Sequence, residues 1–147
     1  MTSMDDLTLA YLAGCLDSDG YFTIRLDHGP KSIVLGQSPV LHEEIGLRQV
    51  TPVVPYMLQA AFGGTVYQTR AYPAQGRPLY SWTVLALKAS VAARTVLPFL
   101  RIKGDQAQAL LDLRAAKEAW HGRRPLTPEE IASRQAIRTR VQTLNGH

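Results

Sequence analysis

The pattern of hydrophobic and polar positions changes its period at Gly20. Over residues 7–17, apolar and small side chains recur every three or four positions, which is the spacing of one helix face. Over residues 21–27, apolar side chains alternate with polar ones, which is typical of a strand with one buried face. The sequence therefore predicts a helix over residues 4–16 that leads almost directly into a strand over residues 21–27.

Cap, turn and periodicity signals divide the rest of the chain. Ser3 with Asp6 resembles a capping box for the first helix, and Thr127 followed by Pro128 marks the start of the last. A strand is predicted within 42–51, followed by a helix over 53–62 that Gly63 and Gly64 close. Two strands, over 65–72 and 79–87, flank a turn at 73–78. Three helices follow, over 88–100, over 105–120 with Asp105 as its cap, and over 128–144. This order, αββαββα followed by further helices, predicts an α+β fold whose four-stranded antiparallel sheet is covered on one face.

Length and composition limit the class of protein. The 147 residues are enough for one domain with its own core, so a single domain over 1–147 is expected. No apolar run reaches the roughly 20 residues that a membrane-spanning helix needs, and no signal-peptide pattern opens the chain, so a soluble intracellular protein without membrane contact is expected. The net charge of +4 is a mild indication of a polyanionic partner. Cys15, the one cysteine, fits a small buried hydrophobe better than a nucleophile.

Asp17 and Asp19 lie at the C-terminal end of the first predicted helix. The helix dipole and the unpaired carbonyls already concentrate negative charge there, so a positive or hydrogen-donating group is expected beside them. A divalent cation with oxygen ligands, a pair of N–H donors and a nearby Lys or Arg would each meet this need.

The uncovered face of the predicted sheet is either solvated or bound to a partner. Polar, aromatic and basic residues fall on its strands and hairpins, among them Arg25, Arg48, Gln49, Tyr67, Arg70 and Arg77. A face of this kind could enter the major groove of DNA, stack single-stranded bases, or be the ordinary wet side of a sheet.

The acidic helix end followed by a βαββ unit resembles the LAGLIDADG homing endonucleases. Residues 12–20, Leu-Ala-Gly-Cys-Leu-Asp-Ser-Asp-Gly, match the family motif at Leu, Ala, Gly, both Asp and the final Gly. The resemblance extends to residues 62–64, 80–82, 97–103 with Gln106 following, and 143–145, and so covers almost the whole chain.

The resemblance implies that the motif helix pairs two subunits. Its implied interface residues are Leu12, Ala13, Gly14, Leu16 and Asp17, with Gly14 allowing close packing and Asp17 supporting the helix end. The chain has one motif and no internal repeat, so the family geometry implies a homodimer on a pseudo-palindromic double-stranded DNA target.

The resemblance also implies a metal-dependent chemistry. Asp19 and Gly20 are the implied metal-binding positions, and Mg²⁺ is the implied ion, with Mn²⁺ or Ca²⁺ able to occupy the same site. Lys103 matches a basic residue beside the scissile phosphate, where it would stabilise transition-state charge or polarise the water. Hydrolysis of a phosphodiester needs an activated water and neutralised charge, which bound Mg²⁺ supplies.

The chain departs from the family after the second strand. There the family often places a polar residue, commonly Gln, that orients the metal-bound water, whereas this chain has Pro52. Proline cannot fill that role, so Gln49 or Thr51 substitutes, ordered water bridges to the backbone, or activity is reduced.

Strand alternation predicts which side chains would contact DNA. Thr23, Arg25 and Asp27 would face DNA from the first strand, Tyr67 and Thr69 from the third, and Ser81 and Thr83 from the fourth, with Trp82 pointing inward. A slip of one residue would reverse these sets.

The leading hypothesis is a site-specific DNA endonuclease, and the alternative is a non-cleaving binder such as an intron RNA-splicing maturase or a regulator. Intact Asp19 and Lys103 favour the enzyme, while Pro52 leaves the alternative open.

Overall fold

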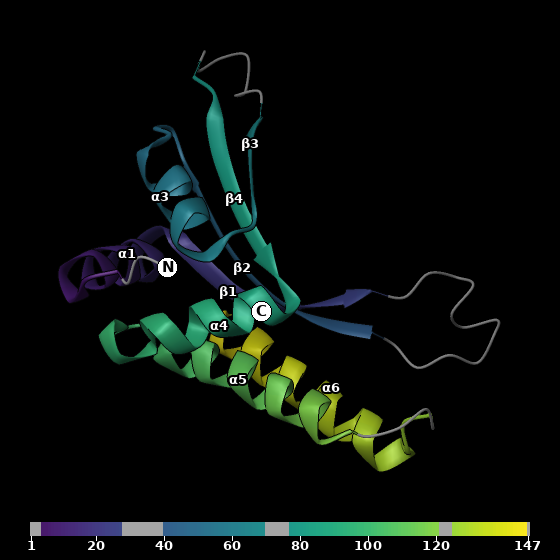
Figure 1. The fold of residues 1–147 in the computed structure, drawn as a ribbon. Coiled ribbons are helices and arrows are strands. Elements are labelled where there is room, and N and C mark those ends of the chain that lie inside the picture. Colours follow the sequence, from purple (N-terminus) through teal and green to yellow (C-terminus); the bar gives the residue numbers. More distant parts are fainter. Residues whose placement is uncertain (1–3, 28–39, 70–76, 121–124, 147) are drawn as a thin grey trace.

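The computed structural model describes residues 4–27, 40–69, 77–120 and 125–146. In chain order these form α1 (Asp6–Asp19), β1 (Gly20–Asp27), β2 (Val40–Gln49), α3 (Val53–Phe62), β3 (Thr65–Thr69), β4 (Leu79–Leu85), α4 (Ala86–Val96), the short 3₁₀ helix η1 (Leu97–Phe99), α5 (Gly104–Ala119) and α6 (Pro128–Leu144) (Figure 1). The predicted order of helices and strands is confirmed. No helix in these described ranges has the length and apolar character to cross a membrane.

The four strands form one sheet in the order β1-β2-β4-β3, and every neighbouring pair is antiparallel. The helices pack on one side of the twisted sheet, and the opposite side is open (Figure 1). The predicted α+β fold, with a four-stranded antiparallel sheet covered on one face, is therefore confirmed.

Strand alternation places the core between the sheet and the helices. Phe22 of β1, Ile45 and Leu47 of β2 and Trp82 and Val84 of β4 are at most 1% exposed. The indole Nε1 of Trp82 donates to the carbonyl of Gly63 at 2.8 Å, which satisfies the polar atom of the largest buried side chain. The prediction that Trp82 points inward is confirmed.

Local signals located some element ends and missed others. Helix α3 has the predicted bounds because Pro52 precedes it and Gly63, with a φ of 79°, ends it. The capping residue of α1 is Asp5, whose side chain accepts from the Thr8 N–H at 2.7 Å, and Ser3 lies outside the described residues. Helix α1 also continues beyond the predicted end to Asp19.

Further bounds differ from the sequence prediction. Strand β2 begins at Val40 and ends at Gln49, and the turn at 73–78 lies mostly outside the described residues. Asp105 is not the cap of α5, because it lies in the first turn and Lys103 occupies the cap position. Pro98 interrupts the predicted helix over 88–100, so α4 ends at Val96 and η1 follows.

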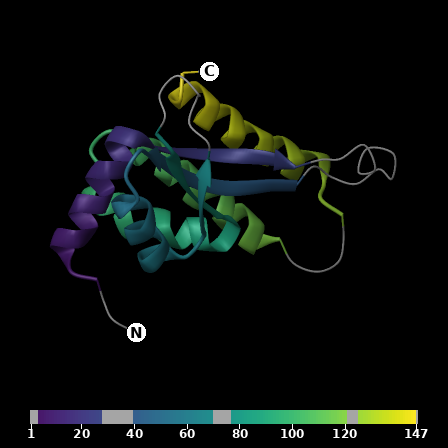
Figure 2. The ribbon, with the colours of Figure 1, turned by 90° about the horizontal axis from the view of Figure 1, so that it is seen from above.

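Helix α6 lies along β1, which is an edge strand of the sheet (Figure 2). It starts with the predicted Thr127 cap, which forms a capping box with Glu130. Arg138 Nε donates to the carbonyl of Ile24 at 3.3 Å, and Asn145 Nδ2 donates to the carbonyl of Phe22 at 2.9 Å. Side chains from this helix and from its C-cap residue Asn145 thus satisfy carbonyls on the edge strand, which protects that edge.

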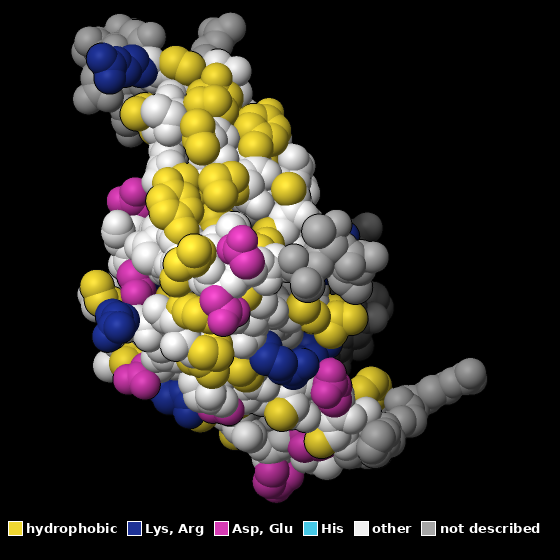
Figure 3. Space-filling view, turned by 60° about the vertical axis from the view of Figure 1, so that its left-hand side comes forward, with side chains coloured by type: hydrophobic (Ala, Val, Ile, Leu, Met, Phe, Trp, Pro, Cys, Tyr) yellow, Lys and Arg dark blue, Asp and Glu magenta, His cyan; other side chains and the backbone are white. Residues whose placement is uncertain are grey.

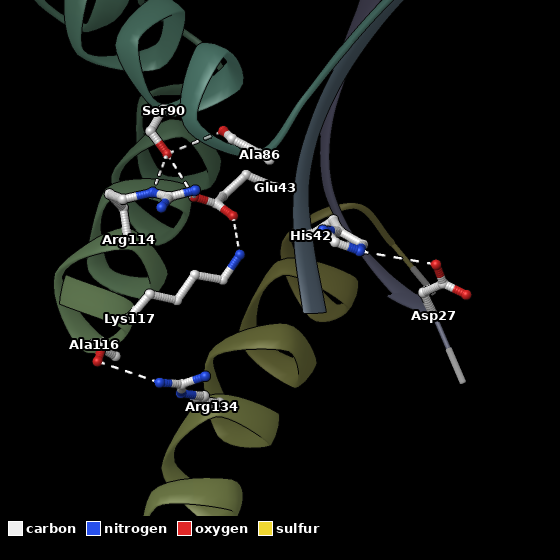
Figure 4. A network of polar contacts seen from close by, with 9 residues as sticks. All are labelled: Asp27, His42, Glu43, Ala86, Ser90, Arg114, Ala116, Lys117 and Arg134. Atoms are coloured by element: carbon white, nitrogen blue, oxygen red, sulfur yellow. Dashed lines mark hydrogen bonds and ion pairs between the residues drawn. The ribbon is translucent and has the colours of Figure 1, made fainter. Parts of the chain in front are cut away.

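A buried ionic cluster joins the sheet to α4 and α5 (Figure 4). Glu43 of β2 is 0% exposed and faces the core side of the sheet. Arg114 donates to its Oε2 from Nε and Nη2, both at 2.7 Å, Ser90 Oγ donates to Oε2 at 2.5 Å, and Lys117 donates to Oε1. The four side chains therefore form one connected network rather than isolated pairs.

The hydrogen bonds of this cluster keep Glu43 ionised. Burial alone would raise the pKa of Glu43, but the hydrogen bonds from Lys117 and Ser90 outweigh it and hold the pKa below its ordinary value. Burial lowers the pKa of Lys117, and the attraction of Glu43 offsets this only in part. A charged Glu43 opposite two cations is the arrangement that offsets the desolvation of all three.

Candidate functional site

Asp17 is a buried carboxylate in the last turn of α1, and its oxygens accept from three backbone N–H groups. The N–H of Arg101 donates to Oδ2 at 2.8 Å, and those of Ile102 and Lys103 donate to Oδ1 at 3.1 and 2.9 Å. Hydrogen bonds to an ionised acceptor are strong, so these donors stabilise the charge despite burial. At Asp17, backbone donors therefore meet the need that the sequence predicted for the helix end.

Lys103 belongs to the same backbone segment and reaches the helix end with its side chain. Its ammonium donates to the carbonyl of Leu16 at 3.3 Å and to the carbonyl of Gly20. Both carbonyls lie where the dipole of α1 concentrates partial negative charge. Asp17 fixes the backbone of this segment, and the fixed backbone in turn places the cation of Lys103 beside the junction of α1 and β1.

Asp19 is the last residue of α1, and its side chain is exposed, unlike that of Asp17. Gln49, the last residue of β2, donates from Nε2 to Asp19 Oδ2 at 2.9 Å. Pro52 occupies the cap position of α3 and Thr51 is exposed. Of the two residues suggested as substitutes for a polar side chain at position 52, the structure brings Gln49 to Asp19.

Gly20 allows β1 to start directly against the last turn of α1. A Cβ at this position would lie 2.8 Å from Leu16 Cδ2 and 2.9 Å from Leu16 Cα. The φ of −90° is open to any residue, so the requirement is space rather than an unusual backbone conformation. This close approach keeps the Asp19 carboxylate, the Gly20 carbonyl and the Lys103 ammonium together.

The oxygens at this junction suit a hard divalent cation, but one chain offers few of them. Asp19 contributes a carboxylate and Gly20 a carbonyl, which are ligand types that Mg²⁺ and Ca²⁺ prefer. Within the described ranges, no three His, Cys, Asp or Glu side chains gather into a metal-binding group. Beside the junction is a hollow of about 530 Å³, lined in part by Gly20, Lys103, Gln106 and Asn145. The donor set therefore fits an ion only if further oxygens come from outside this chain.

The open face of the sheet carries most of the side chains predicted to contact DNA, together with others. By register and burial, the residues on this face are Tyr21, Thr23, Arg25 and Asp27 of β1, His42, Glu44 and Arg48 of β2, Thr65, Tyr67 and Thr69 of β3, and Ser81 and Thr83 of β4. The predicted alternation is found on the three strands for which it was stated. Arg25 and Tyr67 are exposed on this face.

Some of the expected contact residues have other positions. Ser81 shares the open face by register but is only 1% exposed, and its hydroxyl has no hydrogen-bond partner among the described residues. Gln49 faces Asp19 instead of the open face. Arg77 is exposed just before β4, and Arg70 lies outside the described residues.

The structure places four of the five residues expected at the pairing surface of α1 in the core of this chain. Leu12, Ala13 and Leu16 are 0% exposed and Asp17 is 9% exposed, because all four pack into the core of this chain. They have almost no surface left for a second copy. Of the five expected interface residues, Gly14 alone lies on the exposed side of the helix.

The exposed side of α1 is formed by residues at a helical spacing, namely Leu7, Ala10, Tyr11, Gly14 and Ser18. Leu7 is 83% exposed and Tyr11 is 53% exposed, and Val53 and Tyr56 of α3 are 60% and 51% exposed. Figure 3 views the molecule from this side, and apolar side chains gather in a band across it. Beside Gly14 lies a hollow of about 360 Å³ that Pro98 and Phe99 of η1 also line.

Comparison with known proteins gives matches among solved structures. No protein-family model and no curated protein matches the chain. The homing endonuclease I-CvuI, solved with its target in the presence of calcium, has a TM-score of 0.72 at 19% identity, covering 96% of this chain and 83% of its own. The archaeal intron-encoded homing endonuclease I-Vdi141I, complexed with DNA, has a TM-score of 0.73 at 14% identity, covering 96% and 86%.

A third similar structure is the LAGLIDADG homing endonuclease I-GzeII in complex with its DNA target. It has a TM-score of 0.62 at 13% identity, and the match covers 92% of this chain but 44% of that chain. These likenesses define the class of fold: the chain has the LAGLIDADG homing endonuclease fold, as the motif at residues 12–20 predicted.

Proposed function

We propose that this chain is a LAGLIDADG homing endonuclease that cleaves a site-specific double-stranded DNA target as a homodimer, with a divalent metal ion such as Mg²⁺. The observation that carries the proposal is the junction of α1 and β1. There an exposed Asp19 carboxylate, the Lys103 ammonium and the Gln49 amide converge at one end of an open sheet. Three similar solved structures that are named homing endonucleases support the same reading.

Each residue has a distinct part in the proposed hydrolysis. Asp19 would hold the ion through a carboxylate oxygen, and Gly20 through its carbonyl. When bound, the ion supplies a more acidic water and neutralises charge on the phosphate. Lys103 would move from the Gly20 carbonyl to the phosphate and stabilise the developing negative charge, and Gln49 would orient the carboxylate or the attacking water.

The incomplete donor set of one chain supports a homodimer. Two copies related by a two-fold axis near α1 would bring two Asp19 carboxylates together and provide the missing oxygens. The apolar exposed side of α1 would be buried in such a pairing, and Gly14 has no heavy atom within 4 Å of an added Cβ, so it leaves room for close approach.

The direct test is to separate binding from cleavage with Asp19→Asn. This substitution keeps the size of the side chain and its position beside Gln49 but removes a charged metal ligand. We expect double-strand cleavage of a selected target in Mg²⁺ to fall at least about a hundredfold, as when a catalytic charge is removed, while target affinity in a gel-shift assay is retained.

Asp112→Asn is the matched control, because Asp112 is an exposed carboxylate that pairs with Arg140 away from the junction. It should cleave as the unchanged protein does. If the unchanged protein binds a target but never cuts it with any of Mg²⁺, Mn²⁺ or Ca²⁺, the chain is a non-cleaving nucleic-acid binder and the proposal is wrong. Full cleavage by Asp19→Asn would also contradict it.

A further inference from the structure

Tyr21 lies across the open face of the sheet in space that another residue would normally fill. Tyr21 pairs with Gly46 in the register of β1 and β2, and Gly46 pairs with Thr83 of β4. A Cβ at Gly46 would lie 2.4 Å from both Cζ and Oη of Tyr21. The absence of a side chain at residue 46 therefore lets the phenol ring lie flat over β2 and point toward β4.

Thr83 of β4 pairs with Gly46, and Glu44 lies two residues from Gly46 on the same face of β2, so both residues flank the Tyr21 ring. Burial, followed by the hydrogen bond to Glu44, raises the pKa of Tyr21 to about 12. The hydroxyl therefore remains protonated at neutral pH and donates to the Glu44 carboxylate. Arg25 approaches the same carboxylate from the other side, with Nη1 3.9 Å from Oε1.

Glu44 is thus a largely enclosed acceptor beside an exposed donor. Its side chain is 15% exposed, whereas the Arg25 side chain is 56% exposed. A carboxylate on a face that approaches DNA is repelled by phosphates, which favours its placement beside a base that donates to it. In the major groove, cytosine presents its N4 amino donor and the paired guanine presents the O6 and N7 acceptors.

We infer that Arg25 and Glu44 together read one C·G base pair in each half-site of the DNA target, with Tyr21 as the residue that positions Glu44. Glu44 accepts from cytosine N4, and Arg25 donates to O6 and N7 of the paired guanine. The adjacent acceptor and donor match the order of groups across that pair. This inference rests on the proposed DNA-binding function. It assigns a base preference at one base pair of the target, which the fold alone does not give.

The test is a binding selection from a randomised duplex library with the full chain, comparing the unchanged protein with Glu44→Gln and Tyr21→Phe. We expect the unchanged protein to select C·G at one position in each half-site. Glu44→Gln should lower the preference for cytosine there by about tenfold or more, because a neutral amide presents a donor as well as an acceptor. Tyr21→Phe should relax preference at that same position and leave the others unchanged.

Asp112→Asn is the matched control, because Asp112 is an exposed carboxylate that pairs with Arg140 away from the open face of the sheet, and its substitution changes the net charge equally. It should leave the C·G preference intact. The thermal unfolding midpoint of Tyr21→Phe is compared with that of the control. If the two midpoints agree, the changed base preference of Tyr21→Phe comes from the position of Glu44 and not from a loss of structure. The inference is overturned if Glu44→Gln selects the same bases as the unchanged protein, or if the unchanged protein selects a target without this C·G pair. Failure of the unchanged protein to select any sequence would instead overturn the proposed function.

Discussion

At the scale of residues, the two acids of the motif have opposite environments. Asp17 is buried and accepts from the backbone of residues 101–103, whereas Asp19 is exposed and accepts from Gln49. A carboxylate that already has three donors has little capacity left for an ion, while the exposed one keeps a free oxygen. The division of roles between neighbouring acids thus follows from tertiary contacts.

The buried Glu43 cluster gives a prediction about stability. Glu43→Gln leaves Arg114 and Lys117 opposite a neutral group, so the free energy of unfolding at pH 7 should fall by about 3 to 5 kcal/mol, as when one partner of a buried ion pair is removed. Asp112→Asn breaks the exposed pair with Arg140 and should cost about 1 kcal/mol or less. Urea denaturation of both variants measures the difference, and equal losses would contradict it.

The same cluster should make stability depend on pH. The pKa of Glu43 is held below its ordinary value of 4.5, so its contribution is complete above that pH and is lost as the pH falls through the folded-state pKa. Urea denaturation from pH 7 down to pH 3 should show a steeper loss for the unchanged protein than for Glu43→Gln.

Sequence patterns located these residues only in part. The acids and the need for a donor could be predicted at residues 17–19, but not which donor, because residues 101–103 lie more than eighty positions along the chain from Asp17. Glu43 was missed as a core residue. Its register between Leu41 and Ile45, which face the core, is the signal that could have placed it there.

At the scale of elements, α1 belongs to the core of its own chain and also presents a free apolar side. Leu12 and Leu16 fill the core, whereas Leu7, Tyr11 and Gly14 remain on the outside. The sequence predicted pairing through the motif residues themselves. Because 3.6 residues make one turn, residues two positions apart point in different directions. Only the burial of each side chain shows which side of the helix packs into the core of its own chain.

Gly14→Ala separates the stability of the chain from its pairing. An added Cβ meets no heavy atom within 4 Å, so the isolated fold should gain up to about 1 kcal/mol of stability from the better helix propensity of alanine. The same methyl group obstructs close packing of two α1 helices, so the dimer dissociation constant should rise by about tenfold or more.

Sedimentation equilibrium and urea denaturation check both halves of this prediction. Ser133→Ala, at an exposed position of α6 outside the proposed pairing surface, is the control and should leave pairing unchanged. A Gly14→Ala protein that pairs as tightly as the unchanged protein would show that α1 is not the interface.

At the scale of the whole molecule, the fold was predictable and the completed site was not. Period, caps and turn residues gave the order of elements and the antiparallel sheet, because those signals are local. The junction at Asp19 is assembled from the ends of α1 and β2 and from the segment before α5, which sequence spacing does not bring together. A single chain also supplies one carboxylate where the proposed chemistry uses two.

One measurement tests the central claim most directly. A randomised plasmid library is incubated with the unchanged protein and Mg²⁺, and both cut ends are sequenced. We predict cleavage of both strands at one recurring, approximately two-fold symmetric sequence, and its loss when the metal is chelated or Asp19 is replaced by Asn. A target that is cut without two-fold symmetry, or a library that remains uncut while a sequence is bound, would contradict the account.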